Sequence, residues 1–317
     1  MTHLRLLPLL AALLASGCHS RTELVVFHAS SLSRVLSDLA EELEREAPDL
    51  RVHLEPSGSQ VAARKITELG MRADLVAVAD AALIDRMLLP SHARFNAVFA
   101  TNEMVLAHKG HSRFTEEVTS ENWPEVVLRA GVRLGRASPD LAPIGYHTLF
   151  VWQLAERSGR YGKDGERLEA RLRERCGERA TTDEAELLSL LESKAIDYAF
   201  LYRSTAEDHR LKTTPLPAEL NLSSPELAPR YASAAVEVAM KQAEARTRLT
   251  GSPVTYGLTI PADAPHPAAA LRLAAFILGE RGQRALRRAG FRPVAPATCA
   301  QWGEAPLALR PLLLSPR

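Results

Sequence analysis

Short apolar strands alternate with amphipathic helical segments along most of the chain, and this alternation constrains the fold more than any other feature. Apolar runs at 24–27, 52–54 and 75–79 are each followed by a helical pattern. In the first helix, leucine and valine recur on one face between Leu32 and Leu43. Such strand–helix alternation predicts an α/β fold with mixed, mostly parallel sheets flanked by helices.

A second series of elements follows a strand-like crossing at residues 95–110, FNAVFATNEMVLAHKG. In it we expect strands at 132–137 and 197–202 and helices at 147–157 and 182–193. We assign Tyr146 and Trp152, which lie in or beside the first of these helical stretches, to the core.

A second crossing near SPVTYGLTIPAD leads into a helical pair broken between Gly279 and Gly282, and then into a proline-rich tail. We expect that tail, residues 291–317, to be an irregular cover. The pattern predicts two lobes with a ligand cleft between them. Lobe I comprises residues 22–104 and 258–317, and lobe II comprises residues 105–257.

The first 18 residues resemble a secretory signal that ends in a bacterial lipobox. Arg5 precedes an apolar run, and Ala15-Ser16-Gly17 leads to Cys18. The run is too short to span a bilayer as a stable helix. We expect Cys18 to be acylated and to anchor the protein at the outer face of the inner membrane, in the periplasm. The alternative is an ordinary cleaved signal in which Cys18 has no role.

Two cysteines remain, Cys176 and Cys299, and the sequence leaves open whether they pair, because separation along the chain says nothing of distance in space. The 39 basic and 38 acidic residues give a net charge of +1, so nothing suggests nucleic acid binding. Hydrophobic residues make up 46% of the 317, which is enough for packed cores. No histidine or cysteine cluster has zinc-like spacing.

Serines follow two of the predicted strands where a helix begins. Ser30 and Ser31 follow the first strand, and Ser59 follows the second in EPSGSQ. Ligands of open α/β sheets bind at these carboxyl ends, and helix N-termini attract anions. Serine also caps helices without any ligand, so each serine alone has a purely structural explanation. Two such junctions together favour a shared oxyanion site.

Several segments, in order, resemble one family: the extracytoplasmic molybdate/tungstate-binding proteins of ABC importers, especially the tungstate-type branch. They are FHASSLSRVL, EPSGSQVAARKITELGMRADLVAVAD, FNAVFATNEMVLAH, SPDLAPIGYHTLFVWQLAE, DYAFLYRSTAEDHRLKTTPLPAELNL and TYGLTIPADAPHP, and they cover most of residues 24–295. The resemblance implies a type II periplasmic-binding-protein fold. It implies a monomer that binds tungstate or molybdate, has no cofactor and no enzymatic activity, and delivers its ligand to a membrane permease.

The resemblance also implies the site residues. Ser31 and Ser59 would donate from lobe I, while Glu184, Tyr202 and backbone amides near 143–146 would close from lobe II, with Ser30 and Ala142 as further candidates. Glu184 would approach the molybdenum or tungsten atom itself. These metals have room for an added oxygen ligand whereas sulfur does not, so a carboxylate would repel sulfate.

Two features weigh against this set. The sequence Thr181-Thr182-Asp183-Glu184 also fits a capping box, which gives Glu184 a structural explanation. In addition, the tungstate-type branch has an aspartate immediately before the proline of DLAPIGY, where this chain has Ala142. Asp140 could replace that carboxylate only if the loop shifts.

Three other points complete the expectations. Arg34 and Arg64 lie in the first turns after the serines and are expected to be solvated. A receptor for sulfate or phosphate remains an alternative, because the acidic ligand at position 142 is missing. A secreted hydrolase using Ser31 is another, although no G-x-S-x-G motif surrounds Ser31. We expect His28 to be a packed or hydrogen-bonded residue at the strand end.

Overall fold

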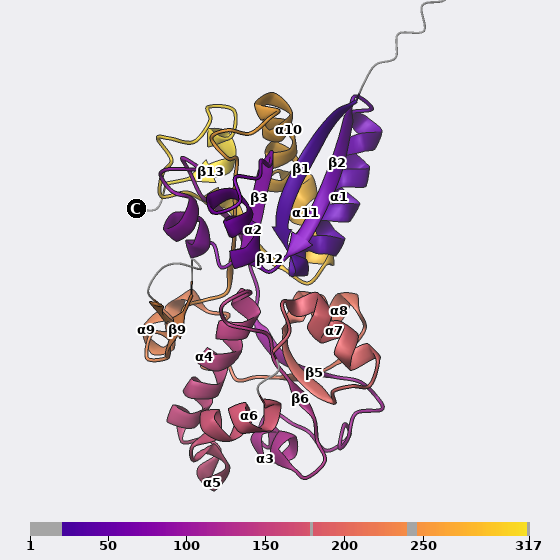
Figure 1. Ribbon diagram of the computed structural model, residues 1–317, viewed down its shortest axis with the longest axis vertical. Coiled ribbons are helices and arrows are strands. Elements are labelled where there is room, and N and C mark those ends of the chain that lie inside the picture. Colours follow the sequence, from indigo (N-terminus) through magenta and orange to yellow (C-terminus); the bar gives the residue numbers. More distant parts are fainter. Residues whose placement is uncertain (1–20, 178–179, 240–245, 316–317) are drawn as a thin grey trace, which may run out of the picture.

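A computed structural model describes residues 21–177, 180–239 and 246–315, so the predicted signal and Cys18 lie outside the described part. Two α/β lobes stack along the long axis of the molecule (Figure 1). Lobe I is built on a seven-stranded sheet and lobe II on a four-stranded sheet. The predicted fold class, a two-lobed α/β binding-protein fold, is therefore confirmed.

The sheet of lobe I has the strand order β13-β12-β4-β11-β3-β1-β2. Its strands are β1 Thr22–Ala29, β2 Leu50–Ser57, β3 Leu75–Ala79, β4 Ala97–Thr101, β11 Thr255–Thr259, β12 Arg292–Thr298 and β13 Leu313–Leu314. Its helices and turns are η1 Ser30–Leu32, α1 Ser33–Glu46, α2 Ser59–Thr67, η2 Ile84–Leu88, α10 Pro267–Leu278, α11 Glu280–Arg288 and η4 Arg310–Leu312. Helices α1, α10 and α11 pack together.

The sheet of lobe II has the order β6-β7-β5-β8. Its strands are β5 Met104–His108, β6 Leu134–Gly135, β7 Tyr198–Tyr202 and β8 Lys212–Pro215. Its helices are α3 Trp123–Leu128, α4 Pro143–Ser158, α5 Gly162–Gly165, α6 Leu168–Cys176, α7 Glu184–Glu192, α8 Arg203–Asp208, η3 Pro225–Leu227 and α9 Ala228–Tyr231. A hairpin of β9 Ala235–Val238 and β10 Thr247–Thr250 completes this half of the chain.

Alternating residues of β5 and β7 bury both faces of the lobe II sheet. Leu106 and Phe200 belong to the main core, which also contains side chains of α3, α4 and α6. Val105 and Leu201 belong to a separate cluster with leucines of α7. This two-sided burial is what the continuous apolar sequence of β7 requires. It fixes α4 and α7 on opposite faces of the sheet, with their N-termini toward lobe I (Figure 1).

The two sheets are less parallel than we predicted. In the four-stranded sheet of lobe II, β6 and β7 pair in parallel, whereas β5 is antiparallel to both β7 and β8. In lobe I, β1 is parallel to β2 and to β3, whereas β11 is antiparallel to both of its neighbours. The antiparallel pairs arise where the chain passes between the lobes, because β4, β5 and β11 flank these crossings.

The chain crosses between the sheets at residues 102–103 and 251–254. The lobe boundaries predicted at 104 and 257 lie within a few residues of these positions. Strand β11 pairs along its length with β3 and β4, which assigns Thr255 to Gly257 to the lobe I sheet.

Other elements differ from their predicted limits. The strand expected at 132–137 shrinks to the two residues of β6, and the helix expected at 147–157 begins four residues earlier, at Pro143. Part of the tail expected to be irregular forms β12 within the lobe I sheet. The helical pair is confirmed, since α10 and α11 meet at Gly279.

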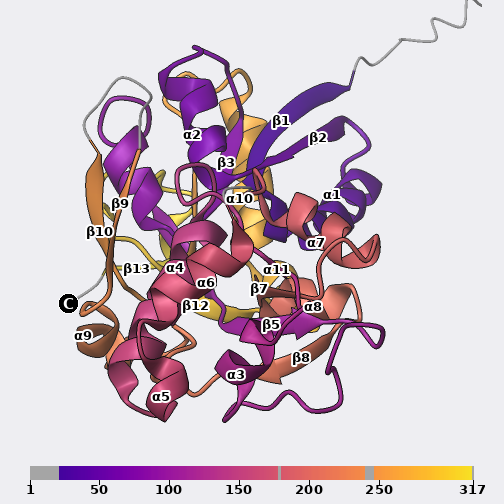
Figure 2. The ribbon, with the colours of Figure 1, turned by 60° about the horizontal axis from the view of Figure 1, so that its bottom comes forward.

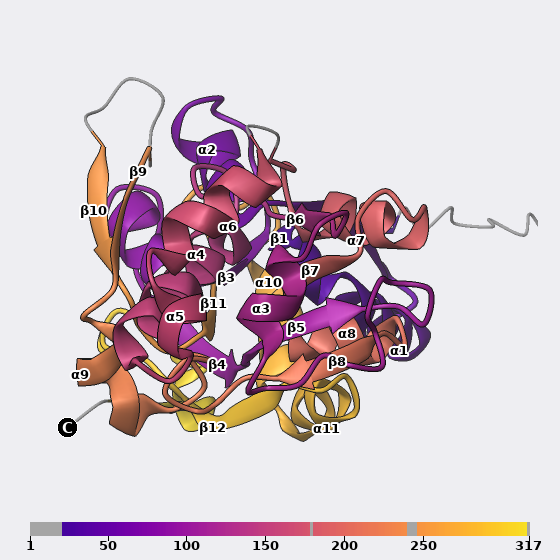
Figure 3. The same cartoon turned by 90° about the horizontal axis from the view of Figure 1, so that it is seen from below.

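The hairpin β9–β10 and helix α7 lie on opposite sides of the molecule (Figures 2 and 3). Each reaches the other lobe: α7 contacts η1, and the Arg64 side chain of α2 donates to the Ala239 carbonyl oxygen just beyond β9.

Cys176 and Cys299 lie in different lobes and are both free, so they do not pair. Within the described ranges, no helix is long and apolar enough to cross a bilayer.

Candidate functional site

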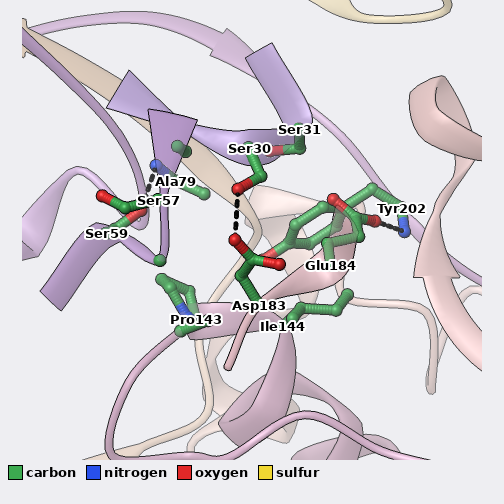
Figure 4. A pocket seen from close by; sticks show the side chains of 13 residues that line it. Ser30, Ser31, Ser57, Ser59, Ala79, Pro143, Ile144, Asp183, Glu184 and Tyr202 are labelled. Carbon is green, nitrogen blue, oxygen red and sulfur yellow. Dashed lines mark hydrogen bonds between the residues drawn. The ribbon is translucent and has the colours of Figure 1, made fainter. Parts of the chain in front are cut away.

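A pocket lies between the lobes at the carboxyl ends of β1, β2 and β3 (Figure 4). Its enclosed volume is small, about 10 Å³. Lobe I contributes Ala29, Ser30, Ser31, Ser57, Gly58, Ser59 and Ala79, and lobe II contributes Ala142, Pro143, Ile144, Asp183, Glu184 and Tyr202. All six candidate residues named from the sequence therefore line one pocket: Ser30, Ser31, Ser59, Ala142, Glu184 and Tyr202.

The serines at the two strand–helix junctions do not cap the helices that follow them. Helix α2 has Gly58 at its N-cap and α1 has Leu32, and neither cap makes a side-chain hydrogen bond. The Ser59 hydroxyl instead accepts a hydrogen bond of 3.1 Å from the Ala79 amide, and the Ser31 hydroxyl lies 3.2 Å from the Tyr256 hydroxyl. Capping alone therefore does not explain these residues.

Unused hydrogen-bonding groups gather at the pocket. The first N–H groups of a helix have no acceptor within the helix, and both α2 and α4 begin at the pocket wall. The Ser57 hydroxyl, at the end of β2, is buried and has no hydrogen-bond partner. An anion with several oxygens can satisfy such donors at once, and the partial positive charge of a helix N-terminus favours it.

Ala142 lines the pocket but has no carboxylate to direct at a ligand. It is the N-cap of α4, and Pro143 occupies the first helical position, which needs no N–H. Asp140 does not replace the missing carboxylate. Its oxygen Oδ1 accepts from the Ala239 amide at 2.8 Å and lies 2.9 Å from the Arg246 guanidinium.

The lobes approach each other closely beside Ala142. A Cβ atom on Gly58 would overlap the carbonyl oxygen of Leu141 in lobe II. Gly58 has an extended backbone conformation that any residue can adopt, with φ −60° and ψ 143°. It is therefore the missing side chain, and not a special backbone angle, that the site requires at this position.

Glu184 is a buried carboxyl group at the first position of α7, only 3% exposed. Its Oε1 accepts the Tyr202 amide at 3.0 Å, while its Oε2 has no hydrogen-bond partner. Burial raises the pKa of Glu184 to about 8, against the opposing effects of the Tyr202 amide and the nearby Thr205 hydroxyl. Without a ligand, this carboxyl group keeps its proton at neutral pH.

The capping box suggested by the sequence exists, but it does not include Glu184. Asp183 is the N-cap of α7, and its Oδ1 accepts the Glu186 amide at 3.0 Å, while Glu186 Oε2 accepts the Thr182 amide at 2.7 Å. The structural explanation for Glu184 is therefore wrong, because its neighbours cap the helix.

Asp183 was not predicted as a site residue, yet it lines the pocket. The Ser30 hydroxyl donates across the cleft to Asp183 Oδ2 at 2.8 Å (Figure 4). One signal for Asp183 was available in its capping position, since an aspartate that caps a helix with one carboxylate oxygen has the second oxygen free to face a cleft.

Tyr202 ends β7 and is buried, at 1% exposed. Its hydroxyl lies 2.9 Å from His147 Nδ1, so this hydroxyl already has a partner within lobe II. Burial holds the pKa of Tyr202 well above its ordinary value and lowers the pKa of His147 to about 4, so both side chains are neutral at pH 7. Tyr202 thus lines the pocket and holds Glu184 through its backbone amide.

The described residues that line the pocket include no lysine or arginine. Arg34 is exposed, as predicted, and pairs with Asp38 at 3.1 Å. The prediction for Arg64 is wrong: it is only 9% exposed, because it packs against the β9–β10 hairpin. Neutral donors must therefore compensate most of the charge of any anion in this pocket.

The geometry does not support a serine hydrolase. The Ser31 hydroxyl faces Tyr256, whereas His28 Nδ1 lies 2.9 Å from the carbonyl oxygen of its neighbour Ala29. His28 is fully buried at the end of β1, as expected from the sequence. A nucleophile needs a base within hydrogen-bond reach, and this pair does not provide one.

The amino-acid sequence is similar to those of known solute-binding proteins. Residues 24–292 match the family described as bacterial extracellular solute-binding protein. A relative from Pyrococcus abyssi, named molybdate/tungstate-binding protein WtpA, is 33% identical over 290 residues, which are 84% of this chain and 83% of the relative.

Two solved structures share the fold. The periplasmic molybdate-binding protein of Azotobacter vinelandii superimposes with a TM-score of 0.61 at 16% identity, covering 84% of this chain and 98% of the other. The sulfate-binding protein SubI of Mycobacterium tuberculosis H37Rv gives 0.62 at 14% identity, covering 86% and 88%. At such identities the likeness concerns the fold alone.

Proposed function

The chain belongs to the family of bacterial extracellular solute-binding proteins, and from this premise we propose that it binds tungstate or molybdate. A relative at 33% identity carries that name, and most of both chains aligns. The protein would work as a monomer that delivers the anion to the permease of an ABC importer, without catalysis of its own.

The observation that carries this proposal is the meeting of donors from both lobes in one pocket. Ser30, Ser31, Ser57 and Ser59 supply hydroxyls, and the first turns of α2 and α4 supply amides. Removing a divalent anion from water is costly unless several donors receive it. A tetrahedral oxyanion has four oxygens for these donors.

Glu184 supports a metal oxyanion in particular. Its Oε2 is buried, lines the pocket and makes no hydrogen bond. As a carboxylate it would add an oxygen ligand to molybdenum or tungsten. Because Ala142 has no carboxylate, Glu184 alone would bind the metal atom. We therefore expect fewer added oxygen ligands than in a site with two carboxylates.

We propose that Cys18 carries a lipid that holds the protein at the periplasmic face of the membrane. Expression of the full chain in a bacterium, with labelled fatty acid, tests this. The wild-type protein should incorporate label and sediment with membranes, and Cys18→Ser should do neither. Label retained in Cys18→Ser would contradict the lipid anchor.

The binding test is isothermal titration of residues 19–317 with tungstate, molybdate, sulfate and phosphate. We expect one-to-one binding of tungstate or molybdate, weakened by about tenfold or more in Glu184→Gln, because the amide cannot supply the carboxylate oxygen that would bind the metal atom. The matched control is Glu186→Gln in the same first turn of α7, since Glu186 caps the helix outside the pocket.

The other outcomes are equally informative. No binding of either metal oxyanion would contradict the proposal. Binding of sulfate or phosphate instead would support the second candidate, a receptor for another tetrahedral anion, which Ala142 favours because it adds no negative charge. An equal loss in Glu184→Gln and Glu186→Gln would remove Glu184 from the site.

A further inference from the structure

We propose that a hydrogen bond between Asp80 and Tyr146 is a latch that holds the two lobes closed. The Tyr146 hydroxyl in lobe II donates to Asp80 Oδ2 in lobe I at 2.6 Å. The inference rests on the proposed function, because a latch matters only where lobes open and close around a ligand. It names residues that set affinity without touching the anion.

Asp80 is held in place by lobe I alone. It follows β3 with a left-handed φ of 64°, which aspartate tolerates better than most residues. Its amide donates to the Thr255 carbonyl oxygen at 2.7 Å, and its Oδ1 accepts the Ala82 amide at 3.2 Å. The carboxylate is thereby fixed with Oδ2 toward lobe II.

Tyr146 is held equally firmly by lobe II. It lies in the first turn of α4, is 1% exposed, and packs edge-on against His147 with ring centroids 4.8 Å apart. Among the described residues, the hydrogen-bond partner of its hydroxyl is Asp80 in the other lobe. Burial and the Asp80 carboxylate both raise the pKa of Tyr146, so the phenol keeps the proton that it donates.

The groups around the carboxylate leave this bond intact. The Arg86 guanidinium lies 3.7 Å from Asp80 Oδ2, on the lobe I side. A hydrogen bond to a charged, buried acceptor is among the stronger kinds. When the lobes open, water can bond to both the phenol and the carboxylate. The hydrogen bond therefore stabilises the closed form by less than the energy of the bond in isolation.

The latch differs from the Ser30–Asp183 contact between the lobes, although the Gln60–Pro139 and Arg64–Ala239 hydrogen bonds also join protein groups of the two lobes outside the pocket. The Ser30–Asp183 bond lies in the pocket, where an anion would compete for the same hydroxyl. Neither Asp80 nor Tyr146 lines the pocket. Their bond joins only protein groups and can form with any anion or with none, so it shifts the balance between open and closed lobes by a constant amount.

The test is the distance between lobes, measured by single-molecule fluorescence in the absence of any anion. Dyes on Glu280→Cys in α11 and Glu116→Cys in lobe II, both exposed positions, would report it, with Cys176→Ser and Cys299→Ala removing the native thiols. Tyr146→Phe should shift the population toward the longer distance, and Asp80→Ala should do the same from the other side.

Tyr161→Phe is the matched control. It removes a buried tyrosine hydroxyl whose partners, Trp123 and Ser120, lie in lobe II, so it should leave the distance unchanged. In titrations with tungstate and molybdate, Tyr146→Phe should raise both dissociation constants by the same factor, roughly tenfold, with the stoichiometry still one.

Distances in Tyr146→Phe and Asp80→Ala equal to wild type would overturn the latch. So would failure of both variants to fold, because a contact between lobes is not needed to form either lobe. The fluorescence experiment uses no ligand, so it decides the latch even if the protein binds another anion. If the protein binds tungstate but the distance between the lobes is the same in wild type and in both variants, the proposed function stands and the latch is contradicted.

Discussion

Burial changes the acid–base chemistry of Glu184 strongly. Its pKa is about 8 in the folded protein and near 4.5 when exposed. Between these values the unfolded chain loses a proton that the folded protein keeps, so Glu184 makes the folded state less stable as pH rises through this range. Below pH 4.5 its stabilising contribution is complete, and above about 8 it is lost.

Glu184→Gln should therefore change stability in a pH-dependent way when no ligand is present. We expect the variant and wild type to have similar free energies of unfolding at pH 5, and the variant to be more stable by more than about 1 kcal/mol at pH 8. Urea unfolding across this pH range measures the difference. A difference that stays constant with pH, or that Glu186→Gln reproduces, would contradict the buried, protonated carboxyl group.

Asp183 sets the negative charge of the pocket. Asp183→Asn retains one oxygen that can cap α7, and its amide nitrogen can donate to the Ser30 hydroxyl in place of the acceptor that is lost, so the stability should change by less than about 0.5 kcal/mol. Removing the carboxylate should strengthen sulfate binding tenfold or more, because a like charge next to the anion is lost. Calorimetric titration with sulfate checks this. Unchanged sulfate affinity would mean that Asp183 is already neutralised.

The sequence predicts a site residue only where a local pattern marks its position. Ser31 and Ser59 follow apolar strands, so their place at the sheet edge was readable from the sequence. Asp183 was not predicted because its position fits a helix cap. Tyr146 was assigned to the core because it lies in an apolar helical stretch. Arg64 was assigned to solvent because arginine is usually exposed, and no local pattern revealed the hairpin that covers it.

Helix α2 brings Gly58 against lobe II, and this contact can be tested at the scale of an element. Gly58→Ala should keep each lobe folded, because the backbone angles suit alanine, but it should prevent the approach of α2 to the Leu141 carbonyl oxygen. We expect tungstate binding to weaken more than tenfold. The free energy of unfolding should fall by no more than about 1 kcal/mol, the cost of replacing the glycine N-cap of α2.

Gly110→Ala is the control for that substitution, since a Cβ atom there meets nothing within 4 Å. Calorimetry and thermal melting of both variants decide the matter. Normal tungstate affinity in Gly58→Ala would show that the lobes do not need this close approach.

Element limits were less predictable than element types. Strand β6 is short because only Leu134 and Gly135 pair with β7, and pairing is a tertiary property. Helix α4 starts at Pro143, and proline at the first helical position was a signal available in the sequence. Strand β12 was predicted to be irregular because the tail is proline-rich and has no sustained period, yet it pairs with β4 on either side of a register shift between Pro293 and Thr298.

At the scale of the whole molecule, the two lobes and both crossings were accessible from the order of strand and helix patterns. What the sequence alone did not reveal is how the lobes face each other, since the bonds from Ser30 to Asp183 and from Tyr146 to Asp80 join residues far apart in the chain. The resemblance to a family named residues that line the pocket before any distance was known.

A ligand held by both lobes should stabilise the molecule as a unit, because only the folded, closed form offers all the donors of the pocket. Tungstate at 100 times its dissociation constant should add about 2.7 kcal/mol to the free energy of unfolding and raise Tm by roughly 5 °C. Sulfate at equal ionic strength should not. Differential scanning calorimetry measures both, and an equal rise with sulfate would mean that the pocket recognises charge and shape without regard to the central atom.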